Sequence, residues 1–351
     1  MTLVSVGTFT DGFMGGAPGE GVHLFRLSPD GRSGEPCGVL GGLCSPSYLA
    51  RHPSLPLLYA AERAWSAEDK STGALATLAL GPDGALTLID RRRSGGSFSA
   101  HVAVSPDGRM AALANPLGPT IALFPLGADG VPGDPAGAIF EGRGPRPRQS
   151  APWPHSCWFS PSGQWLLACD MGLDRVSIYD LAGHPAALRP GPLAYAQVSS
   201  GAGARHLAIR ADGRFAYVAN ELDGTISAFA LDEAAGTLTI VQTLPCAAEP
   251  NQPCEIVCDA AGRFLYVTLR GPEAVAVFAV DAESGRLTPH QLAPCLGNTP
   301  RHIALTPDGS LALVSNQLSG QIVGFAVDSD GALAPNGLEI PVPSPACVVF
   351  L

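Results

Sequence analysis

One histidine, three arginines and one glutamate stand at two equivalent positions of a pattern that the chain repeats. Each of them stands eight positions before or after a glycine that marks the turn between two apolar runs. Arginine binds anionic oxygens through two parallel donors, whereas glutamate and histidine accept or carry protons. Gathered in one place, these side chains could bind an anion and move protons beside it. The residues before the glycines are His155, Arg205 and Arg301, and those after them are Glu221, Arg270 and the polar Gln317.

The repeated pattern predicts a β-hairpin, and its clearest copy is RHLAIRADGRFAYVANE at residues 205–221. An apolar run leads into the turn RADG and a β-rich run leads out, with Gly213 supplying the positive φ that such turns commonly need. Because both strands of a hairpin meet at its open end, residues eight before and eight after the glycine should lie close together there. We therefore expect the ionisable residues to converge on one side of the molecule and to form a site.

The copies follow one another at intervals of about 50 residues, which indicates a repeat architecture. Two further strand-like runs follow the hairpin, such as TISAFAL and GTLTIVQTL, so one unit supplies the four strands of a propeller blade. A degenerate copy with HPSLP in its turn covers residues 45–62. The clear copies have their turn glycines at Gly108, Gly163, Gly213, Gly262 and Gly309.

The two ends of the chain look like parts of one unit. The first residues give two strands without the strand that should precede them, and the C-terminal PSPACVVFL resembles that missing strand. Pairing the C-terminal strand with the first strand would close the ring, and it would remove the exposed sheet edges that a linear stack of blades would have. We therefore predict an all-β fold, a seven-bladed β-propeller with blades of four antiparallel strands. It forms a single domain over residues 1–351 and is closed by the C-terminal strand joining the N-terminal blade.

Composition restricts the partners. A formal net charge of -10 argues against a nucleic-acid surface. The N-terminus lacks a basic region followed by an apolar core, and no later segment reaches membrane-spanning length. The nine cysteines form no CxxC pair and are interpreted as buried thiols of a reducing compartment. We expect a cytoplasmic protein with a small-molecule substrate, no metal or other cofactor, and an oligomeric state that the sequence leaves open, a monomer included.

Some polar residues have a structural interpretation beside the functional one. Three histidines begin apolar strands and are expected to form hydrogen bonds between blades. The Gly/Pro-rich segment 126–154 is expected to be a long connection, and its arginines are either solvated or in contact with substrate. Glu221 is the one residue of the set without an evident duty in the repeat. The histidines are His101, His206 and His302, and the arginines are Arg143, Arg146 and Arg148.

Several segments resemble the lactonase family of seven-bladed propellers, which includes propeller-type 6-phosphogluconolactonases and carboxy-cis,cis-muconate cyclases. The resemblance runs the whole length of the chain and rests on VGTFT, PSYLARHP, MGLDRVSIY, ARHLAIRADGRFAYVANEL and PRHIALTPDG. It places the residues implicated in that family on His155, Arg205, Glu221 and Arg270. One departure is WPHS, where Trp153 takes a place that relatives often give to a second histidine.

The resemblance implies a hydrolase for an anionic sugar lactone, with 6-phospho-D-glucono-1,5-lactone as the expected substrate. Hydrolysis needs a base for the water and donors for the oxyanion. Glu221 is the expected base and His155 the proton carrier or donor to the ring oxygen. Arg205 and Arg270, catalytic and substrate-binding at once, are expected to hold the anionic group and the oxyanion, with substrate contacts from Arg301 and Gln317.

Two alternatives use the same fold. A muconate-type cyclase could use the same residues with proton transfer to carbon in place of water attack. A non-catalytic propeller could bind a protein partner by its rim, since fold does not determine function. An exposed apolar patch on the rim would favour this scaffold over a polar pocket.

Overall fold

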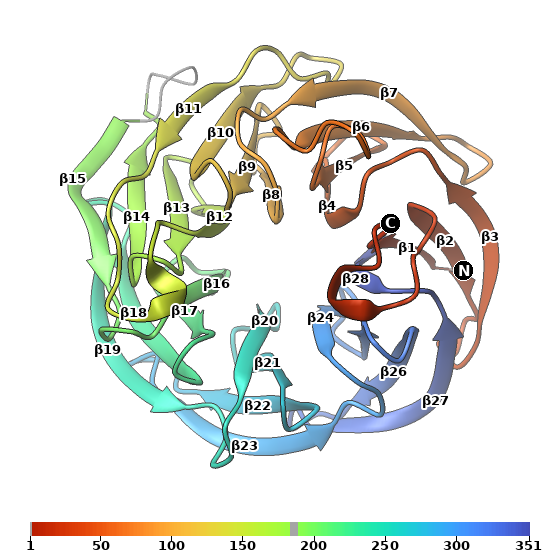
Figure 1. The fold of residues 1–351 in the computed structure, drawn as a ribbon. Coiled ribbons are helices and arrows are strands. Elements are labelled where there is room, and N and C mark those ends of the chain that lie inside the picture. The colour runs from red at the N-terminus through yellow and green to blue at the C-terminus, as the bar shows by residue number, and fades with distance from the viewer. Residues whose placement is uncertain (1, 183–188) are drawn as a thin grey trace.

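The computed structural model describes residues 2–182 and 189–351. These residues form a ring of seven four-stranded antiparallel sheets around a central channel (Figure 1). The all-β prediction, the blade number and the strand number per blade are confirmed. We number the blades from the one that contains the N-terminus.

The strands of each blade are given from the channel outward. Blade 1 consists of β28 (Pro345–Phe350), β1 (Leu3–Thr8), β2 (Val22–Leu27) and β3 (Gly34–Leu40). Blade 2 consists of β4 (Pro46–Arg51), β5 (Leu57–Glu62), β6 (Ala74–Leu80) and β7 (Leu86–Arg93). Blade 3 consists of β8 (His101–Val104), β9 (Met110–Asn115), β10 (Thr120–Pro125) and β11 (Ala136–Ile139).

The remaining blades follow in chain order without exchange of strands. Blade 4 consists of β12 (Pro154–Phe159), β13 (Trp165–Asp170), β14 (Arg175–Asp180) and β15 (Arg189–Gln197). Blade 5 consists of β16 (Ala204–Ile209), β17 (Phe215–Asn220), β18 (Thr225–Asp232) and β19 (Thr237–Pro245). Blade 6 consists of β20 (Gln252–Cys258), β21 (Phe264–Arg270), β22 (Ala274–Val280) and β23 (Leu287–Pro294). Blade 7 consists of β24 (Pro300–Leu305), β25 (Leu311–Asn316), β26 (Gln321–Val327) and β27 (Leu333–Pro341).

The hairpins of the repeat are the two inner strands of each blade. All five turn glycines have φ between 69° and 73°, as predicted for these turns. The middle strands are buried on both faces because each blade packs between two others. In one such core, Trp165 and Leu167 of blade 4 meet Val218 and Phe229 of blade 5. This packing explains why the strands are continuously apolar instead of alternating.

The C-terminal strand closes the ring as predicted. β28 pairs antiparallel with β1, so that Val348 lies opposite Val6 and Phe350 opposite Val4. It also contacts β24 of blade 7 and β4 of blade 2. The innermost strands therefore form an unbroken circle around the channel.

Two sequence expectations need correction. The segment 126–154 is not one connection, since β11 lies within it and pairs with β10, and its Gly and Pro content hides this short strand in the sequence. All nine cysteines are free, but Cys37 is exposed and Cys44 and Cys258 are only partly buried. No helix in the described part of the chain has the length and apolar character needed to cross a membrane.

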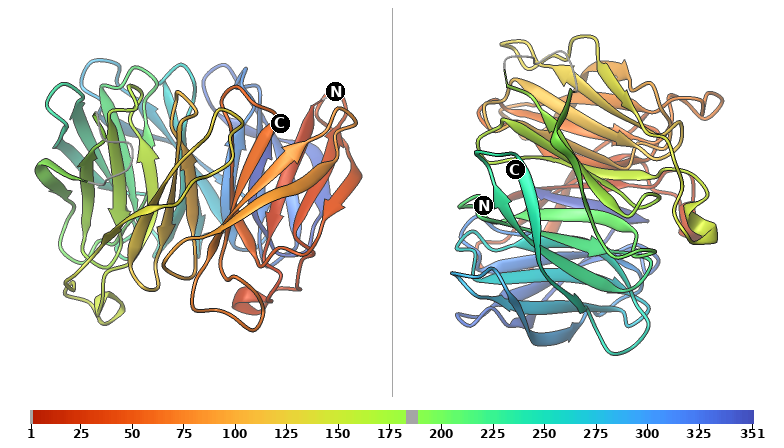
Figure 2. Two further views of the ribbon diagram at one scale, coloured as in Figure 1. Left: turned by 90° about the horizontal axis from the view of Figure 1, so that it is seen from above. Right: turned by 90° about the vertical axis from the view of Figure 1, so that its left-hand side faces the viewer.

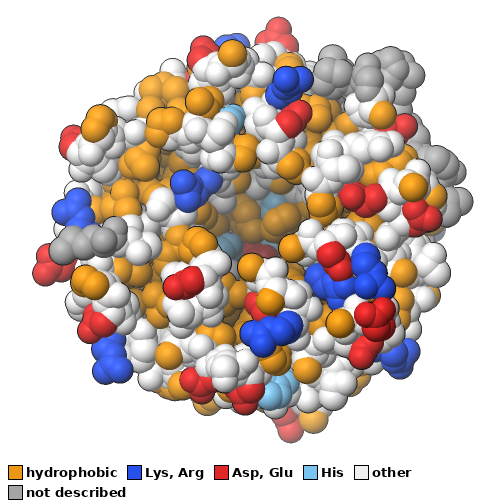
Figure 3. Space-filling model, turned by 180° about the vertical axis from the view of Figure 1, so that it is seen from behind, with side chains coloured by type: hydrophobic (Ala, Val, Ile, Leu, Met, Phe, Trp, Pro, Cys, Tyr) orange, Lys and Arg blue, Asp and Glu red, His pale blue; other side chains and the backbone are white. Residues whose placement is uncertain are grey.

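The two faces of the ring differ. The 3-10 helices η1 (Phe13–Gly15) and η2 (Pro147–Gln149) both project from the face opposite the termini (Figure 2). The other face has a central hollow lined mainly by hydrophobic side chains, with histidine at its floor (Figure 3). The open ends of the inner hairpins lie on the face that carries η1 and η2, and this face holds the candidate site.

Candidate active site

A local irregularity of the inner strands aims the predicted residues at the channel. The pairing register of β12 with β13 shifts between Pro154 and Ser156, and that of β16 with β17 shifts between Ala204 and His206. β24 has the same shift before His302. A bulge leaves one residue unpaired and redirects its side chain. The residues at these three shifts are His155, Arg205 and Arg301.

These three side chains line one cavity in the mouth of the channel. Its volume is about 20 Å³, which is room for a single water molecule. His206 and Glu255 line its inner side, and Arg63 with Phe98 lines its outer side. The predicted convergence of blades 4, 5 and 7 on one site is therefore present in the structure.

Glu221 is held by three arginines. Its carboxylate Oε2 lies 2.8 Å from Nε of Arg205 and 2.9 Å from Nη2 of Arg270, and its Oε1 accepts a hydrogen bond of 3.0 Å from Nη2 of Arg148. Glu221 is 4% exposed. Burial alone would raise the pKa of Glu221, but the charges of Arg270, Arg205 and Arg148 bring it down to about 2. We call these four residues the arginine clamp.

The arginine clamp makes Glu221 a poor general base. Both oxygens of the Glu221 carboxylate are engaged by arginines, which hold its pKa at about 2, so a water proton would have to compete with these cations for the carboxylate. Glu221 was singled out from the sequence, whereas its ion pairs depend on arginines that other segments bring to it. The geometry favours a role for Glu221 in holding the arginines over the base role that we expected from sequence.

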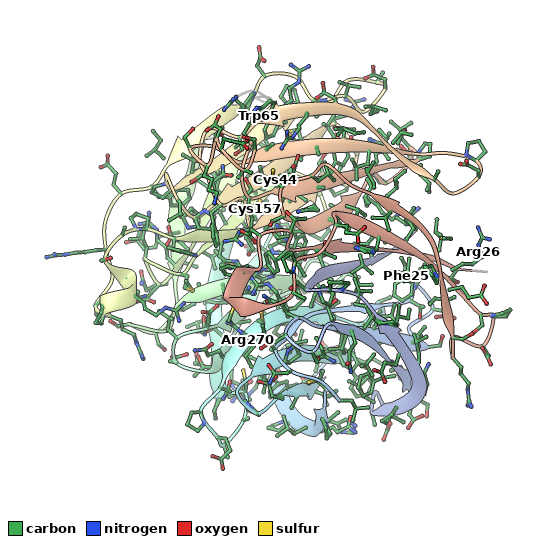
Figure 4. All side chains as sticks on the ribbon, turned by 45° about the vertical axis from the view of Figure 1, so that its right-hand side comes forward. Phe25, Arg26, Cys44, Trp65, Cys157 and Arg270 are labelled. Atoms are coloured by element: carbon green, nitrogen blue, oxygen red, sulfur yellow. The ribbon has the colours of Figure 1, made fainter. Side chains whose placement is uncertain are left out.

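A second, larger cavity adjoins the first across the Arg205–Glu221 ion pair. It has a volume of about 610 Å³ and is lined by Glu221, Arg270, Arg148, the loop residue Asn251 and Gln252 at the start of β20. Arg270, labelled in Figure 4, ends β21 at this wall. His155, Arg205 and Arg301 thus line the first cavity and Glu221 and Arg270 the second, and the Arg205–Glu221 ion pair lies between them. We call them the channel cavity and the outer cavity.

Gln317 lies behind the site and does not line either cavity among the described residues. It is 1% exposed, its Oε1 accepts a hydrogen bond of 3.2 Å from Nη1 of Arg301, and its Nε2 donates to the Phe13 carbonyl at 2.9 Å. Burial lowers the pKa of Arg301 to about 9, which leaves this side chain charged at neutral pH. Gln317 therefore connects Arg301 to η1.

Arg63 was missed by the sequence analysis. Its guanidinium carbon lies 3.5 Å from the ring centre of Phe98 and 4.0 Å from that of Phe13, and its Nη1 lies 3.2 Å from Oδ2 of Asp11. Such stacking on aromatic faces is favourable for arginine. Pro46 pairs with Glu62 in blade 2, and Ala204 pairs with Asn220 at the equivalent place in blade 5. Because Arg63 follows Glu62 and Glu221 follows Asn220, Arg63 occupies in blade 2 the position that Glu221 has in blade 5. The degenerate turn has no glycine to mark this correspondence.

The loop before β12 also reaches the site. Arg148, left open from sequence, contacts Glu221. Gln149 is fully buried and donates to Oδ1 of Asp174 at 2.6 Å, which fixes η2 against blade 4. Arg143 and Arg146 are exposed. Trp153 stacks edge-on against Phe98, with 6.2 Å between the ring centres, and so supports the outer side of the channel cavity.

The three histidines at strand starts do bond between blades. Nδ1 of His206 lies 3.0 Å from Oε1 of Glu255 in blade 6, and Nε2 of His302 lies 3.5 Å from Oε2 of the same carboxylate. The Cys157 amide of blade 4 donates to His101 of blade 3 at 3.4 Å. The structural interpretation is thus confirmed for these contacts. In the described part of the chain, Nδ1 of His155 is also buried without a hydrogen-bond partner, as are Nε2 of His101 and Nε2 of His206.

We expect activity to be independent of divalent metals. In the described residues no group of three or more His, Cys, Asp or Glu side chains is arranged to hold an ion. The arginine clamp offers one carboxylate already neutralised by cations, which is a poor donor set for a hard dication. Turnover should therefore be unchanged after dialysis against EDTA. Loss of turnover that calcium or magnesium restores would contradict this expectation.

Comparison with known proteins decides the family. The chain matches the family model "Lactonase, 7-bladed beta-propeller" over residues 3–350. The protein belongs to this family. A 6-phosphogluconolactonase of Bacillus subtilis is 29% identical to this lactonase-family chain, over 99% of the chain and 97% of the relative. A 6-phosphogluconolactonase of Formosa agariphila is 27% identical, with 92% of each protein covered.

Solved structures agree with this membership. The periplasmic gluconolactonase of Pseudomonas aeruginosa superposes on this lactonase-family protein with a TM-score of 0.89 at 30% identity, covering 100% of this chain and 99% of that chain. A Lactobacillus plantarum protein superposes with a TM-score of 0.90 at 26% identity, covering 100% of both chains. Since one of these relatives is periplasmic, the cytoplasmic location remains a prediction.

Proposed function

We propose that this lactonase-family protein hydrolyses a sugar lactone that carries an anionic group, with 6-phospho-D-glucono-1,5-lactone as the substrate. The observation that carries the proposal is the concentration of arginines at one face of a protein whose net charge is -10. Arginines outnumber carboxylates around the two cavities, so the site attracts an anion that the rest of the surface repels. Two relatives named 6-phosphogluconolactonase support this substrate.

The outer cavity is the place for the lactone. Its volume of about 610 Å³ suits a sugar phosphate, whereas the channel cavity accommodates one water. Arg148 and Arg270 bind the anionic group there through paired donors. Arg205, between the cavities, is placed to stabilise the oxyanion that forms on the lactone carbonyl, and Gln317 positions Arg301 for the same anionic centre.

His155 is the proton carrier of this scheme. It is 7% exposed and lines the channel cavity with Arg205. Burial, with the charges of Arg205 and its neighbours, lowers the pKa of His155 well below its ordinary value, so the ring is neutral at neutral pH. A neutral imidazole can donate one N–H to the ring oxygen of the lactone while its free Nδ1 accepts a proton.

A panel of lactones tests the proposal. We expect 6-phospho-D-glucono-1,5-lactone to be hydrolysed with a higher kcat/KM than D-glucono-1,5-lactone, after subtraction of the spontaneous rate. Inorganic phosphate should inhibit competitively by occupying the arginines. Equal turnover of the neutral lactone would contradict recognition of an anion. No enzymatic turnover of any lactone in the panel would contradict the hydrolase proposal itself.

Arg270→Ala should weaken substrate binding more than it slows turnover. The guanidinium lies at the wall of the outer cavity, and a hydrogen bond to a charged group is worth about 1.5 to 3 kcal/mol, or roughly 10- to 150-fold in KM. Steady-state kinetics on the phosphorylated lactone measures both constants. Arg143→Ala is the control, because it removes an exposed cation from the same face. An equal rise of KM in both variants would show that Arg270 contributes only to the overall positive charge of this face and makes no specific contact with the substrate.

A further inference from the structure

A buried imidazole–carboxylate pair lies against the inner side of the channel cavity. Nδ1 of His206 is 3.0 Å from Oε1 of Glu255, and each residue is 2% exposed. The carboxylate is fixed at both oxygens, because Oε1 also accepts from the Ile256 amide at 3.1 Å and Oε2 lies 3.5 Å from Nε2 of His302. The Glu255 carboxylate thus sets the orientation of the His206 ring.

The other nitrogen of His206 has no partner. Its Nε2 is buried without a hydrogen bond among the described residues, and the ring lines the channel cavity together with Arg205 and Arg301. Buried polar atoms are normally paired, so an unpaired nitrogen on a residue that lines a cavity points to a ligand there. The cavity volume of about 20 Å³ is that of one water molecule.

We propose that His206 is the general base of the reaction and that Glu255 is the positioning residue that holds its ring. This assignment rests on the proposed lactone hydrolysis. In the proposed complex a water in the channel cavity lies against Nε2 of His206, the anionic group of the lactone occupies the outer cavity, and the lactone carbonyl reaches past Arg205 to this water. His206 takes the role that the arginine clamp denies to Glu221.

Nε2 of His206 takes a proton from the water while the water oxygen forms a bond to the carbonyl carbon, and the carbonyl electron pair moves to the oxygen held by Arg205. When that pair returns, the bond between the carbonyl carbon and the ring oxygen breaks. The proton on His206 passes to the free Nδ1 of His155, whose ring centre is 5.1 Å away, while His155 gives its own proton to the ring oxygen. One water is consumed, and the hydroxy acid is formed.

The histidines at the position of His206 in two other blades are not placed to act as the base. His101 and His302 occupy the position of His206 in blades 3 and 7, since each pairs with the corresponding residue of the second strand. Neither of them lines the channel cavity, and His302 lines the apolar hollow on the opposite face. Burial, followed by the charge of Arg205, lowers the pKa of His206 well below its ordinary value, so its ring is neutral at neutral pH. The assignment of the base rests on geometry, namely the orientation of the ring by Glu255 and the unpaired Nε2 beside the channel cavity.

Kinetics on His206→Ala test the base. We expect kcat to fall by about 10² to 10⁴, the usual contribution of a general base, with KM changed by less than about threefold. Added imidazole should restore part of the lost turnover, since the cavity left by the side chain admits a free base. His101→Ala is the matched control at the same repeat position, with the same loss of volume and no expected loss of kcat. Equal kcat for His206→Ala and the control, or no rescue by imidazole, would overturn the assignment.

Glu255→Gln tests the positioning role by a double-mutant cycle. Alone, this substitution should lower kcat, because the ring loses its orientation and the charge that stabilises the imidazolium. In the His206→Ala background it should lower kcat no further, since it acts through His206. An additive loss would show that Glu255 acts only on the fold, and would overturn its role.

A measurement without substrate separates this inference from the proposed function. Nitrogen-15 NMR of the histidine side chains reports the tautomer of His206. We expect a protonated Nδ1 facing Glu255 and an unprotonated Nε2, with the assignment made by loss of the signal in His206→Ala. A proton on Nε2 would overturn the base role whatever the enzyme hydrolyses. The expected tautomer in a protein that hydrolyses no lactone would instead overturn the proposed function while leaving the His206–Glu255 pair in place.

Discussion

Deletion of residues 345–351 is expected to prevent folding to a stable monomer. The deletion removes β28, the inner strand of blade 1, in which Cys347 and Val348 are fully buried and Phe350 is 7% exposed. Burial of each large apolar side chain contributes about 1.5 to 3 kcal/mol, against a total stability of roughly 5 to 15 kcal/mol. The deletion also exposes the unpaired edge of β1.

Thermal unfolding and size-exclusion chromatography measure this effect. The truncated chain should lose its cooperative melting transition or elute as aggregates. Removal of Leu351 alone serves as the control, because it leaves all residues of β28 in place. A monomeric truncated chain with the melting temperature of the full chain would show that ring closure contributes little to stability.

Glu221→Gln is expected to reduce both stability and activity. The substitution leaves Arg205 and Arg270 buried without their carboxylate, and breaking a buried ion pair at one partner typically costs about 3 to 5 kcal/mol. The arginines then lose the geometry with which they bind the lactone, so kcat/KM falls. Because an anion can replace the missing carboxylate, inorganic phosphate should raise the melting temperature of the variant more than that of the wild type.

The pH dependence of stability shows whether the ion pairs of Glu221 cause the stability difference between the variant and the wild type. Arginine contacts lower the pKa of Glu221 from 4.5 to about 2, so the stabilisation is complete above the unfolded pKa and is lost as pH falls through the folded one. The stability difference between wild type and Glu221→Gln should therefore be constant above about pH 5 and should shrink toward pH 2. A Glu221→Gln variant as stable as the wild type at neutral pH would contradict the arginine clamp.

The sequence alone determined the fold. Turn glycines such as Gly213 recur because only a residue without a side chain readily adopts their positive φ, and apolar runs recur because each blade is buried between two others. The unmatched strand at residues 345–350 required closure of the ring, since an unpaired edge is costly. The same register placed His155, Arg205, Glu221 and Arg301 at one face, because the ends of equivalent hairpins point the same way.

The roles of these residues depended on the tertiary structure. Glu221 was predicted as a base because a sequence does not show the charges that distant segments bring to a carboxylate, and Arg148 and Arg270 reach it from a loop and from another blade. His206 was interpreted as structural for the same reason, since its carboxylate partner Glu255 comes from another blade. Proton affinity depends on burial and on neighbouring charge, and both are set only when the ring closes.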